Sequence, residues 1–103
     1  MMDAALTEAL NLLQEECGEL IVISSKVKRF GAQSENPEQP GLTALDRLIQ
    51  EMGDVQCLMH MVQLQLCITD VQLQQAVQKK QEKLNKYSKH LGESHALQNN
   101  SGG

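Results

Sequence analysis

Residues 31–41 (GAQSENPEQPG) separate two long segments whose apolar residues recur with helical spacing. This stretch holds both prolines of the 103-residue chain and has a glycine at each end. Because proline and glycine interrupt helices, no helix is expected to cross it. It exceeds the roughly two to eight residues that usually join packed helices. We interpret it as a solvated loop or, alternatively, as a mobile flap beside an active site.

The segment before this break predicts a helix from Asp3 or Ala4 to about Arg29. Asp3 is a suitable N-cap residue, since its carboxylate can accept a hydrogen bond from a free backbone N–H. Apolar residues then recur at spacings of three, four and seven, as one helix face requires. That face consists of Leu6, Leu10, Leu13, Cys17, Leu20 and Val27.

A second helix is expected to begin near Leu42 or Thr43, with Asp46 completing a capping box. Its strongest apolar face consists of Leu45, Leu48, Ile49, Met52, Val55, Met59 and Val62. Further apolar residues lie on its other sides, which is typical of a helix buried on more than one side. In so short a chain this predicts contacts between subunits.

Thr69 and Gln72 fit another capping box, so a third helix is expected from this point to about Lys89. The weakly periodic residues 92–103 are predicted to be a disordered tail. The predicted fold class is therefore all-α. Residues 1–91 would contribute three helices per chain to a four-helix-bundle-type core that is completed by oligomerisation.

Composition excludes several classes of protein. The net charge of −4 argues against a nucleic-acid binder that relies on a broad basic surface. No signal peptide is visible, and acidic and amide residues interrupt the apolar stretches before they reach membrane-spanning length. The three cysteines form no CxxC pair and are interpreted as reduced core residues; they are Cys17, Cys57 and Cys67. We expect a cytoplasmic protein without membrane contact.

Two acidic motifs lie inside the first two predicted helices, EECGEL at residues 15–20 and QEMGDV at 50–55. Residues three apart share a helix face, which pairs Glu16 with Glu19 and Glu51 with Asp54. Such pairs are common on solvated faces. Here, however, Glu16 lies between leucines on the apolar line, and each motif contains a mid-helix glycine that costs about 1 kcal/mol relative to alanine. Close approach of a helix or a ligand would explain both glycines.

Four clustered carboxylates repel one another unless a cation joins them. An all-oxygen site suits a hard ion, Mg²⁺ or Mn²⁺, which binds substrate phosphates while retaining water. Lys80 and Lys83 of the third helix are candidates for neutralising phosphate charge. The alternative interpretation is that these lysines form a solvated basic face.

Other chemistries find little support in the sequence. There is no Walker A or GxGxxG motif, and the histidines lack the spacing of zinc ligands. No Ser/His/Asp or Cys/His arrangement suggests nucleophilic catalysis.

The paired motifs resemble the EExxE…ExxD signature of the all-α nucleoside triphosphate pyrophosphohydrolases, the MazG-like and dimeric dUTPase superfamily. The resemblance extends from about Leu6 to Tyr87 and is strongest to short phage-type members. CITDVQL at 67–73 is similar to the joint before the family's last helix, and KKQEKLNKY at 79–87 to its lysine-containing final helix. Two departures are Gln50, where an acidic residue is frequent, and a somewhat long gap between the motifs.

This resemblance implies Mg²⁺-dependent hydrolysis of a nucleoside triphosphate to a monophosphate and diphosphate, and a homodimer or a dimer of dimers. By position, the metal ligands would be Glu16, Glu19, Glu51 and Asp54. Glu15 would orient or deprotonate the attacking water, and Lys80 or Lys83 would contact phosphates.

The nucleobase is not specified by these motifs. With only two aromatic residues in the chain, Phe30, Tyr87 or a second subunit would have to stack on a base, with Asn11 or Gln14 contacting its edge. The competing hypothesis is a non-catalytic helical interaction module whose acidic face is solvated.

Overall fold

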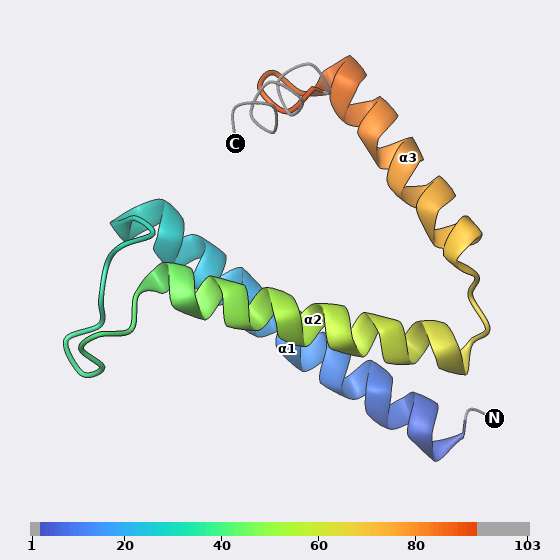
Figure 1. The fold of residues 1–103 in the computed structure, drawn as a ribbon, viewed down its shortest axis with the longest axis horizontal. Helices are drawn as coiled ribbons and strands as arrows, with labels where there is room; N and C mark the ends of the chain where they lie inside the picture. Colours follow the sequence, from blue (N-terminus) through green and yellow to red (C-terminus); the bar gives the residue numbers. More distant parts are fainter. Residues whose placement is uncertain (1–2, 93–103) are drawn as a thin grey trace. The chain divides into compact units, whose positions relative to one another are not determined.

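The computed structural model describes residues 3–92, and these residues form three helices and no strand. The helices are α1 (Ala4–Phe30), α2 (Ala44–Gln65) and α3 (Asp70–Tyr87), shown in Figure 1. They belong to two compact units, Met1–Cys67 and Ile68–Gly103. The all-α prediction is confirmed. Most of the predicted tail, residues 93–103, lies outside the described residues.

The predicted caps are present at the start of all three helices. The Asp3 carboxylate accepts a hydrogen bond from the Leu6 N–H at 2.8 Å. Thr43 and Asp46 form a reciprocal capping box on α2, and Thr69 forms the same arrangement with Gln72 on α3. These side chains satisfy backbone N–H groups that have no partner within the helix. Local sequence therefore determines where each helix begins.

The connection between α1 and α2 is held to the start of α2 by backbone hydrogen bonds. The Ala44 N–H donates to the Ser34 carbonyl and the Leu45 N–H to the Ala32 carbonyl, each at 2.8 Å. Gly31 ends α1 with a φ of 91°, a conformation that glycine adopts without strain. The segment is thus an ordered loop in this structure, and its carbonyl groups help to cap α2.

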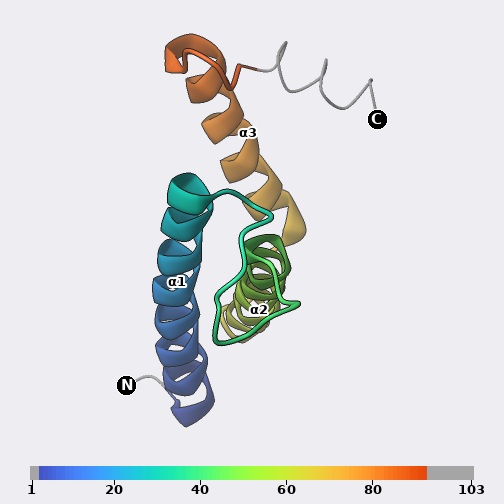
Figure 2. The same ribbon diagram turned by 90° about the vertical axis from the view of Figure 1, so that its left-hand side faces the viewer.

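Helices α1 and α2 pack side by side and run in opposite directions (Figure 1 and Figure 2). We call these two helices and the loop between them the hairpin. On each helix, the buried and partly buried residues recur every three or four positions, which defines the face turned toward the other helix. On α1 this row is Leu6, Ala9, Leu13, Glu16, Leu20, Ile23 and Val27. On α2 it is Ala44, Leu48, Glu51, Val55, Leu58 and Val62. Each of these rows is apolar except for a glutamate near the middle of the hairpin. The partly buried polar residues beside the rows are Ser24 on α1 and Arg47, Asp54 and Gln63 on α2.

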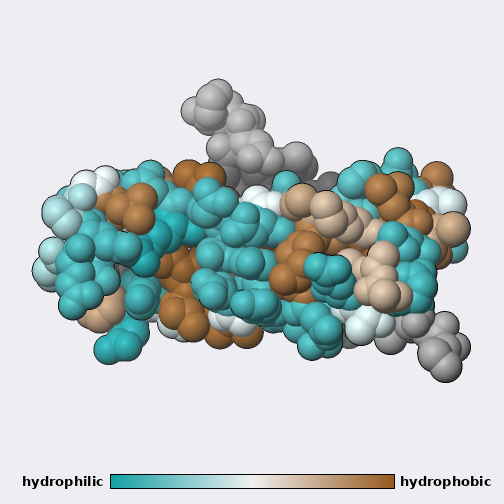
Figure 3. Space-filling model, turned by 90° about the horizontal axis from the view of Figure 1, so that it is seen from below, coloured by the Kyte–Doolittle hydropathy of each residue, from teal (hydrophilic) through white to brown (hydrophobic). Residues whose placement is uncertain are grey.

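The predicted apolar face of α2 divides into two parts. Leu48, Val55 and Val62 are buried or partly buried, whereas four residues on a neighbouring stripe are exposed in the single chain. The exposed stripe consists of Leu45, Ile49, Met52 and Met59. Figure 3 shows hydrophobic residues at the surface of the described chain, between hydrophilic ones. One partner helix is therefore too narrow to cover the apolar surface of α2.

The cysteines differ from expectation. All three are free and exposed, so the prediction that they belong to the core is wrong for the single chain. Cys17 and Cys57 lie on helices whose partner covers only one side, and Cys67 follows the end of α2 with a φ of 55°.

Within residues 3–92, no helix combines the length and apolar character needed to cross a membrane.

Candidate functional site

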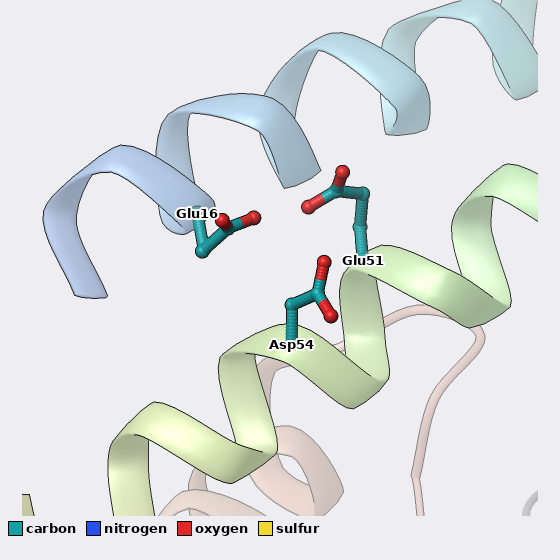
Figure 4. A group of neighbouring side chains, drawn as sticks. All are labelled: Glu16, Glu51 and Asp54. Carbon is teal, nitrogen blue, oxygen red and sulfur yellow. The ribbon is translucent and has the colours of Figure 1, made fainter. Parts of the chain in front are cut away.

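Carboxylates from both helices of the hairpin meet near its middle. Glu16 of α1 points toward Glu51 and Asp54 of α2 (Figure 4). One oxygen from each of the three residues lies within 4.8 Å of the other two, and all three residues are partly buried. The three side chains replace an apolar layer that two packed helices would otherwise form.

Glu51 has the most perturbed electrostatics in this cluster. Its pKa is raised from 4.5 to about 7, first by a side-chain hydrogen bond with Glu16 and then by burial. A hydrogen bond between two carboxyl groups requires that one of them keeps a proton, which raises its pKa. The negative charges of Glu16, Glu19 and Asp54 act in the same direction. Without a cation, the cluster therefore holds a proton close to neutral pH.

One oxygen of Glu51 also lacks a hydrogen-bond partner. Its Oε2 is buried, and no group within residues 3–92 donates to it. A buried oxygen of this kind is costly unless something else binds it. The cluster thus has both the negative charge and the unsatisfied oxygen that a hard cation would require.

Gln50 supports the cluster from the preceding residue of α2. Its Nε2 donates a hydrogen bond to Oδ1 of Asp54 at 2.9 Å. In the sequence, Gln50 is notable only because it stands where the family that the motifs resemble frequently has an acidic residue. In the structure it is the residue that holds the Asp54 carboxylate.

Glu15 and Glu19 lie beside the cluster and not within it. Both are exposed, and both line a cavity of about 800 Å³ on one side of the hairpin. Glu51 lines the same cavity, so it connects the cavity with the carboxylate cluster. Asp46 also borders the cavity, but its carboxylate accepts the Thr43 N–H in the capping box, which lowers the pKa of Asp46.

The two mid-helix glycines are not explained by close packing within the chain. Apart from its chain neighbours and its own helix backbone, a Cβ atom placed on Gly18 or Gly53 would meet no atom of the described residues within 4 Å. Close packing against another described helix is therefore not the reason for either glycine, contrary to one of the two expected explanations. Gly18 does line the 800 Å³ cavity, which leaves approach of a ligand as a reason for its small size.

Sequence reasoning missed two basic residues of the hairpin. Lys26 of α1 and Arg47 of α2 line the same cavity as Glu15 and Glu19. The Nη2 atom of Arg47 is buried and has no hydrogen-bond partner among the described residues. The signal that could have identified Arg47 is its position four residues before Glu51, which places both on one face of α2.

The remaining predicted site residues are exposed. Asn11 and Gln14 lie on α1 outside the lining of this cavity. Lys80, Lys83 and Tyr87 lie on α3, in the second unit, where the Tyr87 ring is 75% exposed beneath the Lys86 ammonium. Of the predicted residues, the structure directly brings together Glu16, Glu51 and Asp54, with Glu15 and Glu19 beside them.

No family model, curated protein sequence or solved structure matches this chain.

Proposed function

We propose that this protein is a Mg²⁺-dependent nucleotide pyrophosphohydrolase that converts (d)NTP and water to (d)NMP and diphosphate. The observation that carries the proposal is the convergence of Glu16, Glu51 and Asp54 from two helices, with oxygens within 4.8 Å. The resemblance of the EExxE and ExxD motifs to the MazG-like pyrophosphohydrolases supports the same reaction.

The residues of the cluster fit a hard divalent cation. Carboxylate oxygens are the ligands that Mg²⁺ and Mn²⁺ prefer, and Oε2 of Glu51 has no other partner among the described residues. Glu16, Glu51 and Asp54 would hold the ion, with Glu19 as a further ligand from the cavity side. Bound there, Mg²⁺ would neutralise phosphate charge and activate the phosphorus toward water.

Glu15 is the candidate general base. It is exposed at the cavity, where a water molecule and a substrate can both reach its carboxylate. In the proposed step, the water oxygen forms a bond to phosphorus while the phosphorus–oxygen bond to the leaving group breaks. This separates the monophosphate from diphosphate. The proton of the water passes to Glu15. General-base catalysis of this kind contributes roughly 10²- to 10⁴-fold to a rate.

Lys80 and Lys83 remain candidate phosphate contacts through the family resemblance. Their exposed positions on α3 leave both ammonium groups available to an anionic ligand. The proposal includes a house-cleaning role, in which the protein hydrolyses non-canonical nucleotides.

We further infer that the active protein is a homodimer or a dimer of dimers. The exposed stripe of α2 includes Ile49, which is 60% accessible to solvent in the single chain. Two copies of the α1–α2 hairpin would supply the four helices of a bundle and bury these stripes. Burial of apolar surface stabilises such a contact by about 25 cal/mol per Å².

The test of the proposed activity is to incubate the protein with a panel of dNTPs and Mg²⁺ and to measure diphosphate release. We expect turnover that is abolished by EDTA and by Asp54→Asn, and strongly reduced in Glu19→Gln. Light scattering coupled to gel filtration measures the mass of the particle in the same preparation. Absence of turnover with every nucleotide, or turnover that survives both substitutions, would favour a non-catalytic interaction module.

A further inference from the structure

Two neighbouring cavities of the hairpin share part of their lining. The first, of about 800 Å³, extends along the acidic residues of α1 and α2. The second, of about 540 Å³, lies between the end of α1, the 31–43 loop and the start of α2. Four residues line both cavities, namely Ile23, Lys26, Leu42 and Arg47. We call the two cavities together the hairpin trough.

The trough has three chemically distinct parts. At one end are the carboxylates of Glu15, Glu19 and Glu51. Lys26 and Arg47 line the shared middle, and within residues 3–92 they are the only basic residues that line either cavity. The other end is lined by the apolar residues Phe30, Pro37 and Ala44, with Ser34, Asn36 and the Glu35 carboxylate of the loop beside them.

Arg47 is the residue in the middle that most requires a ligand. Its Nη2 is buried and has no hydrogen-bond partner within residues 3–92. A guanidinium group binds phosphate oxygens through two parallel hydrogen bonds, so a phosphate chain would satisfy this nitrogen. Lys26 from the opposite helix adds a second positive charge to the same part of the trough.

Phe30 makes the third part suitable for a planar group. The residue is 61% exposed, and the Arg29 guanidinium lies over its ring, 4.9 Å from the centroid. Nucleobases stack on such rings, largely without regard to sequence. Asn36 lines this end as well. Its Oδ1 accepts the Glu38 N–H within the loop, so its amide nitrogen is the atom that can donate to a base edge.

We infer that the hairpin trough binds a nucleoside triphosphate lengthwise, with the base on Phe30 and the phosphates on Lys26 and Arg47. This inference rests on the proposed function and names the specificity-determining end of that site. Of the sequence-derived candidates for contacting the base it keeps Phe30, at the junction of α1 and the loop, and leaves out Asn11, Gln14 and Tyr87. The phosphate chain then points from Arg47 toward Glu51, which lines the acidic part of the trough.

The test compares a nucleotide with inorganic triphosphate, which has the charge but no base. Dissociation constants are measured by calorimetry with a non-hydrolysable dNTP analogue and with triphosphate, both in Mg²⁺. Arg47→Gln is expected to weaken both ligands by about 10- to 100-fold, since a hydrogen bond to a charged group is lost. Phe30→Ala is expected to weaken only the nucleotide, by about 5- to 100-fold.

Lys28→Gln is the matched control, because Lys28 is exposed on α1 and lines neither cavity. Arg47→Lys, with melting curves for every variant, separates loss of the ligand contact from loss of the fold. The inference is overturned if Arg47→Gln binds both ligands as tightly as the wild type does. It is also overturned if Phe30→Ala weakens the binding of triphosphate as much as the binding of the nucleotide.

The two proposals fail in different ways. Diphosphate release with an unchanged KM in Arg47→Gln and Phe30→Ala contradicts the trough and leaves the enzymatic proposal standing. Arg47-dependent binding without any hydrolysis contradicts the enzymatic proposal and supports the trough as a nucleotide-binding site.

Discussion

Glu16 of α1 and Glu51 of α2 meet across the helix interface, and their side-chain hydrogen bond is the largest cause that raises the pKa of Glu51 to about 7. Both residues occupy inward positions that apolar side chains fill elsewhere along the hairpin. The pair therefore weakens the packing of the metal-free chain. Like-charged groups at such a position are typical of functional sites, where binding is favoured at the expense of stability.

The first prediction concerns pH. Between 4.5 and about 7 the folded protein retains a proton on Glu51 that the unfolded chain releases. The free energy of unfolding of the metal-free protein should therefore fall as pH rises through this range, and level off above it. Melting temperatures between about pH 5 and 8 measure this slope. Glu51→Gln should flatten it, whereas Glu8→Gln, at an exposed position of α1, should leave it unchanged.

The second prediction concerns Mg²⁺. At about 100 times its dissociation constant, the ion should stabilise the folded protein by ~2.7 kcal/mol. The increase in melting temperature should be larger above pH 7 than below it, since metal ligands must lose their protons. Glu16→Gln and Asp54→Asn should abolish most of the shift. Glu19→Gln should retain more of it, because Glu19 is not among the three converging residues. A full Mg²⁺ shift in Asp54→Asn would contradict this assignment.

The third prediction concerns Gln50, which we regard as a positioning residue. Its Nε2 donates to Oδ1 of Asp54, so Gln50→Ala releases the Asp54 carboxylate. Loss of a residue that orients a ligand typically lowers metal affinity by about 10- to 100-fold. Calorimetric titration with Mn²⁺ measures the change. Gln56→Ala, at an exposed position of the same helix, is the control and should bind Mn²⁺ as the wild type does.

The fourth prediction separates the two glycines. Because a Cβ at either position meets nothing within 4 Å, alanine should raise the free energy of unfolding by about 1 kcal/mol in each case. Gly18→Ala should also raise the KM for nucleotides, since Gly18 lines the trough. Gly53→Ala should leave KM unchanged. Destabilisation by Gly53→Ala would instead indicate that a helix of a second copy packs against α2 at this point.

Helix positions were predictable because their determinants are local. Asp3, Thr43 and Thr69 cap the three helices, as the sequence predicts, and the glycine- and proline-rich segment separates α1 from α2. The acidic motifs were recognisable for the same reason, since a spacing of three on a helix places two carboxylates on one face.

Relations between helices were less accessible to sequence. The sequence places Glu16 between leucines on the apolar line but assigns Glu16 and Glu19 the same role, whereas only Glu16 is turned toward α2 and joins the cluster. Which member of an i, i+3 pair faces a neighbour depends on the rotation of the packed helix, and both positions border its apolar face. The cysteines were misassigned for a related reason, because periodicity does not say how many sides of a helix are covered.

The sequence by itself determined three capped helices, the break between the first two of them and two carboxylate pairs, because caps, breakers and spacing act within a few residues of one another. The hydrogen bond from Gln50 to Asp54 is local as well, since it joins residues four apart on α2. Tertiary structure alone decided that Glu16, Glu51 and Asp54 converge and that Lys26 and Arg47 line the cavity beside them. Each of these relations depends on how far a helix is rotated about its own axis or on the register of α1 against α2. Packing of the whole helix faces selects both.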